Sequence, residues 1–182
     1  MSATFPHIMI DGVPPGSLPE PLVEALQAQG FEALTDIQRA VLDPETAGSD
    51  MRLSSETGSG KTVALGMAII RDLAETTASK KGPRACVMAP TRELAQQVAR
   101  ELKWLFAAMQ MRVAVVTGGA PYGPEVHALS RKPDVLVATP GRLADHLQRG
   151  NVSHEDVAVL VLDEADQLLE QGFREELDAI RA

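Results

Sequence analysis

Apolar and polar residues follow two periods along this chain, and the change between them marks the expected elements. Short apolar runs without alternation, such as 84–89 (RACVMA), 134–138 (DVLVA) and 157–162 (VAVLVL), predict strands buried on both faces. Between these runs, apolar residues recur three and four positions apart, which predicts amphipathic helices. Strands that alternate with helices predict an α/β fold, namely a doubly wound parallel sheet covered on both faces.

The full set of expected elements divides the chain into three parts. Strands are expected at 51–54, 84–89, 112–116, 134–138 and 157–162. Helices are expected at 19–29, 35–42, 61–77, 92–110, 125–130 and 140–148, with further helical sequence from 164 to the end. We divide the chain into an irregular N-terminal extension (1–18), a helical region (19–42) and the α/β domain (43–182).

Composition narrows the class of protein. With 182 residues, of which 45% are hydrophobic and 23% charged, the chain has the size and balance of one globular domain. Its one cysteine, Cys86, excludes a disulfide framework and predicts a cytoplasmic or other reducing intracellular compartment. The longest apolar run (63–70) is far shorter than the ~20 residues that span a bilayer, so no membrane partner is expected.

The charge balance restricts how this protein can bind nucleic acid. Lys and Arg number 17 against 25 Asp and Glu, giving a net charge of −8. This excludes a protein that coats nucleic acid through bulk positive charge, but it leaves room for a local site of a few arginines and backbone amides. The four histidines (His7, His127, His146 and His154) show no metal-ligand spacing, and we expect them at the surface or at helix caps.

A glycine-rich loop lies between an expected strand and an expected helix. In SSETGSGKT (54–62), Gly58 and Gly60 allow a tight turn whose backbone N–H groups converge on an anion, and the following helix adds its positive dipole end. Lys61 can reach the β- and γ-phosphates of a nucleotide, and the Thr62 hydroxyl can ligate Mg²⁺. The candidate nucleotide-binding residues of this loop are Ser55, Glu56, Thr57, Gly58, Ser59, Gly60, Lys61 and Thr62.

A second motif, which is acidic, follows the expected strand 157–162 directly: Asp163-Glu164-Ala165-Asp166. A strand that ends in Asp delivers its carboxylate to the sheet edge where α/β folds bind ligands, so Asp163 can hold Mg²⁺ together with Thr62. Glu164 is placed to orient and deprotonate an attacking water. Alone, the motif is equally typical of a helix N-terminus. Paired with the loop, it predicts nucleotide hydrolysis, with Lys61, Asp163 and Glu164 as catalytic candidates.

With both motifs present, the chain resembles the first RecA-like domain of a DEAD-box RNA helicase, a P-loop NTPase fold. Four further segments, in the family's order, carry the resemblance. Gly30-Phe31 through Ile37-Gln38 is similar to the Q motif, and 90–97 (PTRELAQQ) to motif Ia. Gly118-Gly119 resembles the GG element, and 139–142 (TPGR) resembles motif Ib.

The resemblance implies ATP and Mg²⁺ as ligands and RNA as partner. By resemblance, Gln38 recognises adenine; an amide suits that role because it donates and accepts on one base edge. Val13 falls where the family has a stacking aromatic, which implies a weaker base contact. The residues implied to contact the RNA backbone, independently of base sequence, are Thr91, Arg92, Gly118, Gly119, Thr139, Pro140, Gly141 and Arg142.

The C-terminal end departs from the family. Sixteen residues follow Asp166 without a Ser-Ala-Thr motif, and no second RecA-like domain is present in this sequence. The family places the Ser-Ala-Thr strand between the phosphate-loop strand and the DEAD strand, so we expect a domain truncated before that strand. Three hypotheses follow: the motor domain of an ATP-dependent RNA helicase, a nucleotide- or RNA-binding fragment without turnover, and a DNA-directed helicase or other P-loop ATPase. The assembled motifs favour the first.

Overall fold

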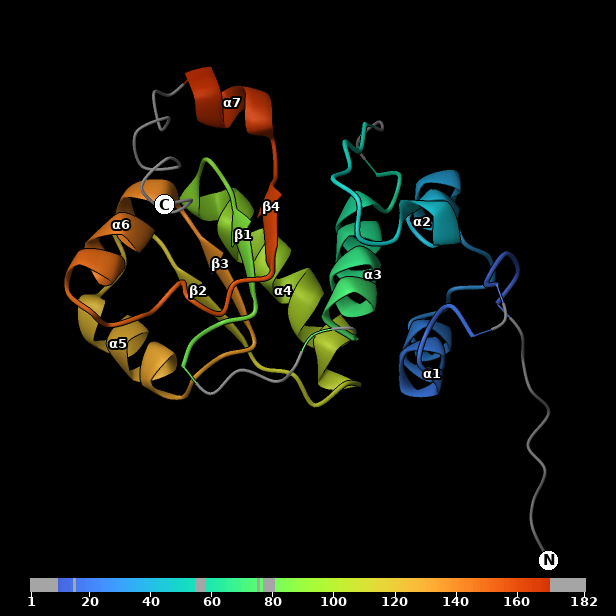
Figure 1. The fold of residues 1–182 in the computed structure, drawn as a ribbon, viewed down its shortest axis with the longest axis horizontal. Coiled ribbons are helices and arrows are strands. Elements are labelled where there is room, and N and C mark those ends of the chain that lie inside the picture. The colour runs from blue at the N-terminus through green and yellow to red at the C-terminus, as the bar shows by residue number, and fades with distance from the viewer. Residues whose placement is uncertain (1–9, 15, 55–57, 75, 77–80, 171–182) are drawn as a thin grey trace, which may run out of the picture.

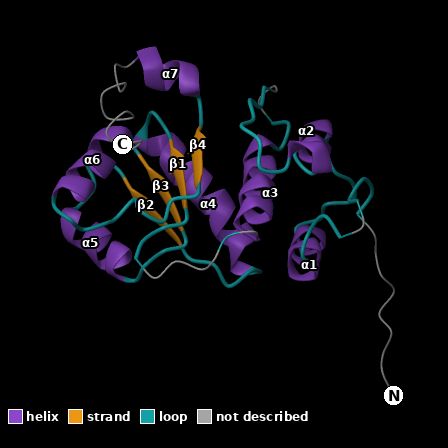
Figure 2. Ribbon diagram, in the orientation of Figure 1, coloured by secondary structure: helices purple, strands orange, loops and turns teal. Residues whose placement is uncertain are grey.

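The structure is a computed structural model that describes residues 10–14, 16–54, 58–74, 76 and 81–170. Within this part of the chain, parallel strands form a four-stranded sheet in the order β2-β3-β1-β4, flanked by helices (Figure 2). The strands are β1 (Ala85–Met88), β2 (Val113–Val116), β3 (Val135–Ala138) and β4 (Val159–Leu162). The helices are α1 (Glu20–Ala28), α2 (Asp36–Ala40), α3 (Lys61–Ala74), α4 (Arg92–Ala107), α5 (Tyr122–Ser130), α6 (Pro140–Gln148) and α7 (Ala165–Glu170), with a 3-10 turn at Pro44–Thr46.

The sheet is covered on both faces, which confirms the doubly wound α/β prediction. Successive strand residues point to opposite faces, so Val87 of β1 packs in the core that α3 and α4 cover, while Met88 packs in the core beneath α5 and α6. β1 and β3 are buried at every position, as expected for central strands of a parallel sheet. Figure 1 shows α3 and α4 on one side of the sheet and α5 and α6 on the other.

One predicted strand is wrong: residues 51–54 form no strand. An apolar stretch can become a strand only where a neighbour satisfies its backbone N–H and C=O groups, and residues 51–54 pair with no strand of the described chain. The resemblance implied a missing neighbour beside 51–54, but 51–54 itself was still expected to form a strand, and the structure overturns that expectation. The other predicted strands form, and none of their ends differs from the prediction by more than two residues.

Among the described residues, β4 forms the edge of the sheet and pairs with β1 alone. Its residues alternate between partly buried and exposed. Leu160 and Leu162 are 38% and 40% exposed, whereas Leu136 in the same layer of β3 is 1% exposed. The described part of the fold therefore leaves apolar surface exposed along β4, the strand that precedes Asp163.

The N-terminal helices belong to the same hydrophobic core as the sheet. Leu22 and Leu26 of α1 are fully buried in the cluster that contains the inner face of α3. Arg71 on α3 fixes the connection after α2, because its guanidinium donates to the Val41 carbonyl at 2.6 Å and to the Thr46 hydroxyl at 2.8 Å. The Q-motif region is thus attached to the helix that begins at the phosphate loop. None of the described helices has the length and apolar character that crossing a membrane requires.

Candidate functional site

The candidate residues gather at one edge of the sheet because the strands are parallel. Each strand ends at this edge, and a predicted motif follows directly: 90–92 after β1, 117–119 after β2, 139–142 after β3 and 163–164 after β4. In open α/β sheets this edge is where ligands bind. The phosphate loop precedes α3, which packs beside β4.

The described end of the phosphate loop has the conformation that the sequence predicts. Gly58 and Gly60 both have φ of +82°, a left-handed backbone that glycine adopts without a steric penalty. Lys61 is the first residue of α3, so the unpaired N–H groups of a 14-residue helix point towards the loop. Ser55, Glu56 and Thr57 lie outside the described residues.

Gln38 is packed against this loop. Its side chain is 1% exposed, its Oε1 accepts a hydrogen bond from the Thr35 N–H at 3.0 Å, and its Nε2 donates to the Gly60 carbonyl at 3.3 Å. The contact is close enough that a Cβ at Gly60 would lie 2.3 Å from Nε2. Gln38 therefore connects the capping box of α2 to the phosphate loop, whereas its contact with adenine stays a prediction.

Asp163 and Lys61 place opposite charges near each other at this edge. The Asp163 N–H donates to the Met88 carbonyl at 2.9 Å, which continues the sheet beyond β4. Burial raises the pKa of the Asp163 carboxyl above its ordinary value, while the positive charge of Lys61 and the Glu164 backbone N–H act in the opposite direction. The described residues contain no group of three His, Cys, Asp or Glu side chains that could hold a metal ion by themselves.

Glu164 has an unusual backbone conformation. Its φ is +50°, in the left-handed region that non-glycine residues seldom occupy. Its carbonyl accepts the Leu168 N–H at 3.1 Å, so the chain turns from strand to α7 at this residue. Backbone strain of this kind is typical of functional positions, and Glu164 is an exposed residue.

Three of the predicted RNA-binding motifs surround a single pocket of about 650 Å³. Arg92 donates to the Gly119 carbonyl at 3.0 Å, and the Gly118 N–H donates to the Thr139 hydroxyl at 3.1 Å. The N-termini of α4 and α6 both lie at this site, because Thr91 caps α4 and Pro140 opens α6. The lining residues are Pro90, Arg92, Gly118, Ala120, Tyr122, Thr139, Gly141, Arg142 and Asp145.

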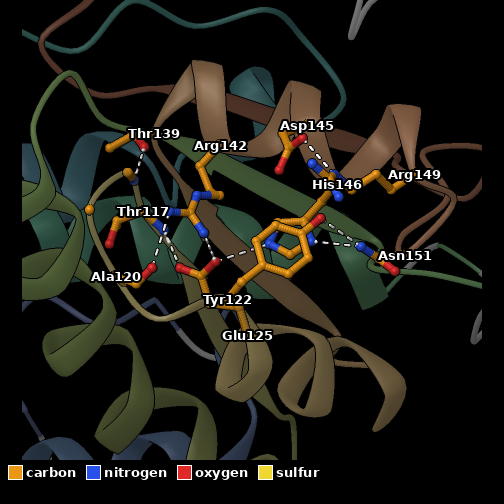
Figure 3. Close-up of polar contacts among 12 residues, drawn as sticks. Thr117, Ala120, Tyr122, Glu125, Thr139, Arg142, Asp145, His146, Arg149 and Asn151 are labelled. Atoms are coloured by element: carbon orange, nitrogen blue, oxygen red, sulfur yellow. Dashed lines mark hydrogen bonds and ion pairs between the residues drawn. The ribbon is translucent and has the colours of Figure 1, made fainter.

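A buried polar network lies beneath this pocket, and the sequence analysis missed it. Glu125 and His146 are 6% and 0% exposed, and the His146 Nε2 lies 3.0 Å from the Glu125 Oε2 (Figure 3). Arg142 donates to the same Oε2 at 2.8 Å. The expectation that His146 lies at the surface or in a cap is wrong. It occupies the buried face of α6 with Pro140 and Leu143, a three-residue spacing that the sequence already contained.

The comparisons with known proteins agree with the geometry. The family profile described as DEAD/DEAH box helicase matches residues 35–182. The chain is 44% identical over 168 residues to the DEAD-box ATP-dependent RNA helicase 3A, chloroplastic, of Zea mays, covering 90% of this chain and 22% of the relative. It is 40% identical over 164 residues to the ATP-dependent RNA helicase DbpA of Escherichia coli (strain K12), covering 90% and 35%.

Solved structures show the same fold. The RNA helicase Prp28 from Chaetomium thermophilum bound to ADP matches with a TM-score of 0.82 and 32% identity, over 98% of this chain and 44% of that one. A hypothetical ATP-dependent RNA helicase from Sulfolobus tokodaii matches with a TM-score of 0.78 and 32% identity, over 90% and 46%. The chain thus spans less than half the length of each of these proteins.

Proposed function

Because the chain belongs to the DEAD/DEAH box helicase family, we propose that it is the N-terminal motor domain of an ATP-dependent RNA helicase. The observation that carries this proposal is the arrangement at one sheet edge. A phosphate loop and an acidic pair lie at one end of that edge, and a pocket lined by motifs Ia, GG and Ib lies beside them. In the complete protein, RNA-stimulated ATP hydrolysis would drive local unwinding of RNA duplexes.

The phosphate loop and Lys61 would bind the nucleotide phosphates through backbone N–H groups and one ammonium charge. Thr62 and Asp163 would hold Mg²⁺, which neutralises charge on the phosphates. The residues suit this role, because Asp163 is an oxygen ligand held near Lys61 and Thr62 supplies a hydroxyl at the start of α3. Two such ligands suffice where substrate phosphates and water complete the coordination of Mg²⁺.

Glu164 would act as the base in hydrolysis. A water attacks the γ-phosphorus, the bond to the β,γ-bridging oxygen breaks, and the proton of the water passes to the Glu164 carboxylate. ADP and inorganic phosphate are the products. The left-handed backbone and the exposure of Glu164 support this role.

RNA would bind along the pocket through its phosphates and sugars. Arg92 and Arg142 supply charge, and the N-termini of α4 and α6 supply N–H groups with a favourable dipole. Such contacts carry no base code, so we propose binding that is independent of RNA sequence. A second RecA-like domain in the complete protein would close over both ligands.

Thermal shift with Mg·ATP tests the nucleotide site. The wild-type chain should melt at higher temperature when Mg·ATP is added, and Lys61→Ala should lose this shift. Lys103→Ala is the matched control, because it removes the same charge from an exposed position on α4. Nucleotide stabilisation that survives in Lys61→Ala would refute the proposed site.

A binding fragment without turnover is the second candidate, because the chain covers only 22% and 35% of the two curated relatives named above. Phosphate release from ATP, measured with and without RNA, separates the two candidates. RNA-stimulated release that disappears in Glu164→Gln supports hydrolysis by this chain. Binding of ATP and RNA with no release supports the fragment.

Adenine reading by Gln38 has its own test. Gln38→Ala should weaken ATP more than GTP if the amide contacts the base. An equal loss of affinity for ATP and GTP would mean that Gln38 does not contact the base and acts only on the phosphate loop, through its hydrogen bond to the Gly60 carbonyl.

A further inference from the structure

Glu125, on α5, connects the loop at Thr117 to two residues of α6 beneath the pocket. Its Oε1 accepts the Thr117 N–H at 2.8 Å, and its Oε2 accepts Arg142 Nη1 at 2.8 Å and lies 3.0 Å from His146 Nε2. The carboxylate is 6% exposed, so solvent contributes little to its stabilisation. A buried carboxylate of this kind is held by its partners, and it holds them in return.

Arg142 is oriented by these contacts and not by solvent. Its side chain is 14% exposed, and its Nη2 donates to the Ala120 carbonyl at 3.1 Å while Nη1 donates to Glu125. Its guanidinium carbon lies 5.4 Å from the centre of the Tyr122 ring. A guanidinium has five N–H donors, so these two bonds leave others for the pocket that Arg142 lines.

His146 contacts the Glu125 carboxylate as well, and its own orientation is fixed by neighbouring residues. Asn151 Nδ2 donates to the Tyr122 hydroxyl at 2.9 Å and lies 3.2 Å from His146 Nδ1. An amide nitrogen can only donate, so in this contact His146 Nδ1 accepts, and the tautomer that follows carries its proton on Nε2 and donates it to Glu125 Oε2. The Tyr122 ring stacks on the imidazole with centroids 4.6 Å apart. Both ring nitrogens of His146 therefore have a partner, Asn151 at Nδ1 and Glu125 at Nε2.

We propose that Glu125 is a positioning residue for RNA binding: it fixes the Arg142 guanidinium and the loop at 117–120 in one arrangement before RNA arrives. This rests on the proposed function. Glu125 acts through Arg142, because its carboxylate lies in the buried network and does not line the pocket. Preorganisation lowers the entropic cost of ordering a long side chain when a phosphate binds.

Whether RNA affinity falls or rises when the Glu125 charge is removed distinguishes a positioning role from an effect of overall charge. Removal of a negative charge near a polyanion site strengthens RNA binding if only the overall field matters. Asp145→Asn removes such a charge from the pocket lining, where its carboxylate pairs with Arg149 at 2.7 Å on the surface of α6, and it should bind RNA as tightly as wild type or more tightly. Glu125→Gln removes the same charge with the same shape, yet positioning predicts weaker binding.

The experiment measures the fluorescence anisotropy of a labelled ten-nucleotide uridine RNA with the full 182-residue chain. Glu125→Gln should raise Kd about tenfold, the equivalent of about 1.4 kcal/mol. It should also reduce the slope of log Kd against log salt by about 0.7, the contribution of one phosphate contact on a single strand. A general loosening of the fold would not remove one contact selectively. An unchanged Mg·ATP thermal shift would show that the variant is folded.

A double-mutant cycle decides whether Glu125 acts through Arg142. The variant carrying Glu125→Gln and Arg142→Ala together should bind no worse than Arg142→Ala alone, whereas additive losses would overturn the proposal. Glu125→Gln that binds like Asp145→Asn would also overturn it. If Glu125→Gln does not fold, Arg142→Lys supplies the test, because it retains the charge and loses the planar donors; wild-type affinity in Arg142→Lys would overturn the proposal. A wild-type chain that binds no RNA would instead refute the proposed function itself.

Discussion

Two glycines of the phosphate loop make it possible to measure the contact between Gln38 and the loop. Gly58 and Gly60 have the same φ of +82°, but their surroundings differ. A Cβ at Gly58 would meet nothing within 4 Å, whereas a Cβ at Gly60 would lie 2.3 Å from Gln38 Nε2. Alanine at either position pays the same backbone penalty, so the difference between the two variants isolates the contact with Gln38.

The magnitude follows from two contributions. A non-glycine residue in the left-handed region costs about 1–2 kcal/mol, which we expect for Gly58→Ala. Gly60→Ala adds the displacement of a buried amide from its hydrogen bond, which costs about 1–3 kcal/mol. The expected loss in the free energy of unfolding is therefore about 2–5 kcal/mol for Gly60→Ala. The smaller entropy of the unfolded chain with alanine affects both variants alike and cancels.

Urea denaturation followed by circular dichroism measures this difference. With a slope near 2 kcal/mol per molar urea, an additional loss of about 2 kcal/mol lowers the midpoint of Gly60→Ala by about 1 M relative to Gly58→Ala. In a Gln38→Ala background the crowding is absent, so the two glycine variants should then lose equal stability. Equal losses in the wild-type background, or a difference that persists without Gln38, would refute this explanation.

The remaining predictions concern burial and charge. Asp163→Asn should raise the melting temperature, because burial disfavours the charged carboxylate and raises the pKa of the Asp163 carboxyl. The native state then holds the carboxyl proton more tightly than the unfolded chain does, so the contribution of Asp163 to stability falls as pH rises through that pKa. The difference in melting temperature between Asp163→Asn and wild type should therefore widen as pH rises, and a difference that narrows would contradict this. The same variant should lose the Mg·ATP shift, because it removes a proposed Mg²⁺ ligand. Burial raises the pKa of the Cys86 thiol to about 12, so Ellman's reagent should react with it only after unfolding in urea. Leu136→Ala should cost about 2–5 kcal/mol in urea denaturation and Leu162→Ala clearly less, because Leu136 is 1% exposed and Leu162 is 40% exposed; equal losses would contradict the assignment of β4 as an open edge.

Local periodicity predicted the helices well because the apolar spacing that defines each helix lies within its own segment. α6 begins and ends at the predicted residues, and α3 begins at Lys61 as expected. The strand predicted at 51–54 failed for a different reason. Whether an apolar stretch becomes a strand depends on a neighbour far along the sequence, and no local pattern contains that information.

The candidate site was predictable where a motif follows a strand, and not where residues meet across elements. Glu125 and His146 are 21 residues apart and come together because α5 and α6 cover the same face of the sheet. His146 was detectable in part, since it continues the buried spacing of Leu143. Its partner was not, because a glutamate near the start of a helix usually points to solvent.

The pocket carries little net positive charge, which agrees with the acidic composition of the chain. Its lining contains Arg92 and Arg142 against Asp145, and Arg142 is already paired with the buried Glu125. The local surplus of positive charge is therefore small, so under the proposed function an RNA backbone would be held largely by the N-termini of α4 and α6. Backbone donors release few counterions when they bind phosphate, so the salt dependence of RNA binding should be shallow for a nucleic-acid site. In such a site, affinity depends on the exact placement of the donors more than on their charge, which makes the residues that fix the loop at 117–120 as important as those that touch RNA.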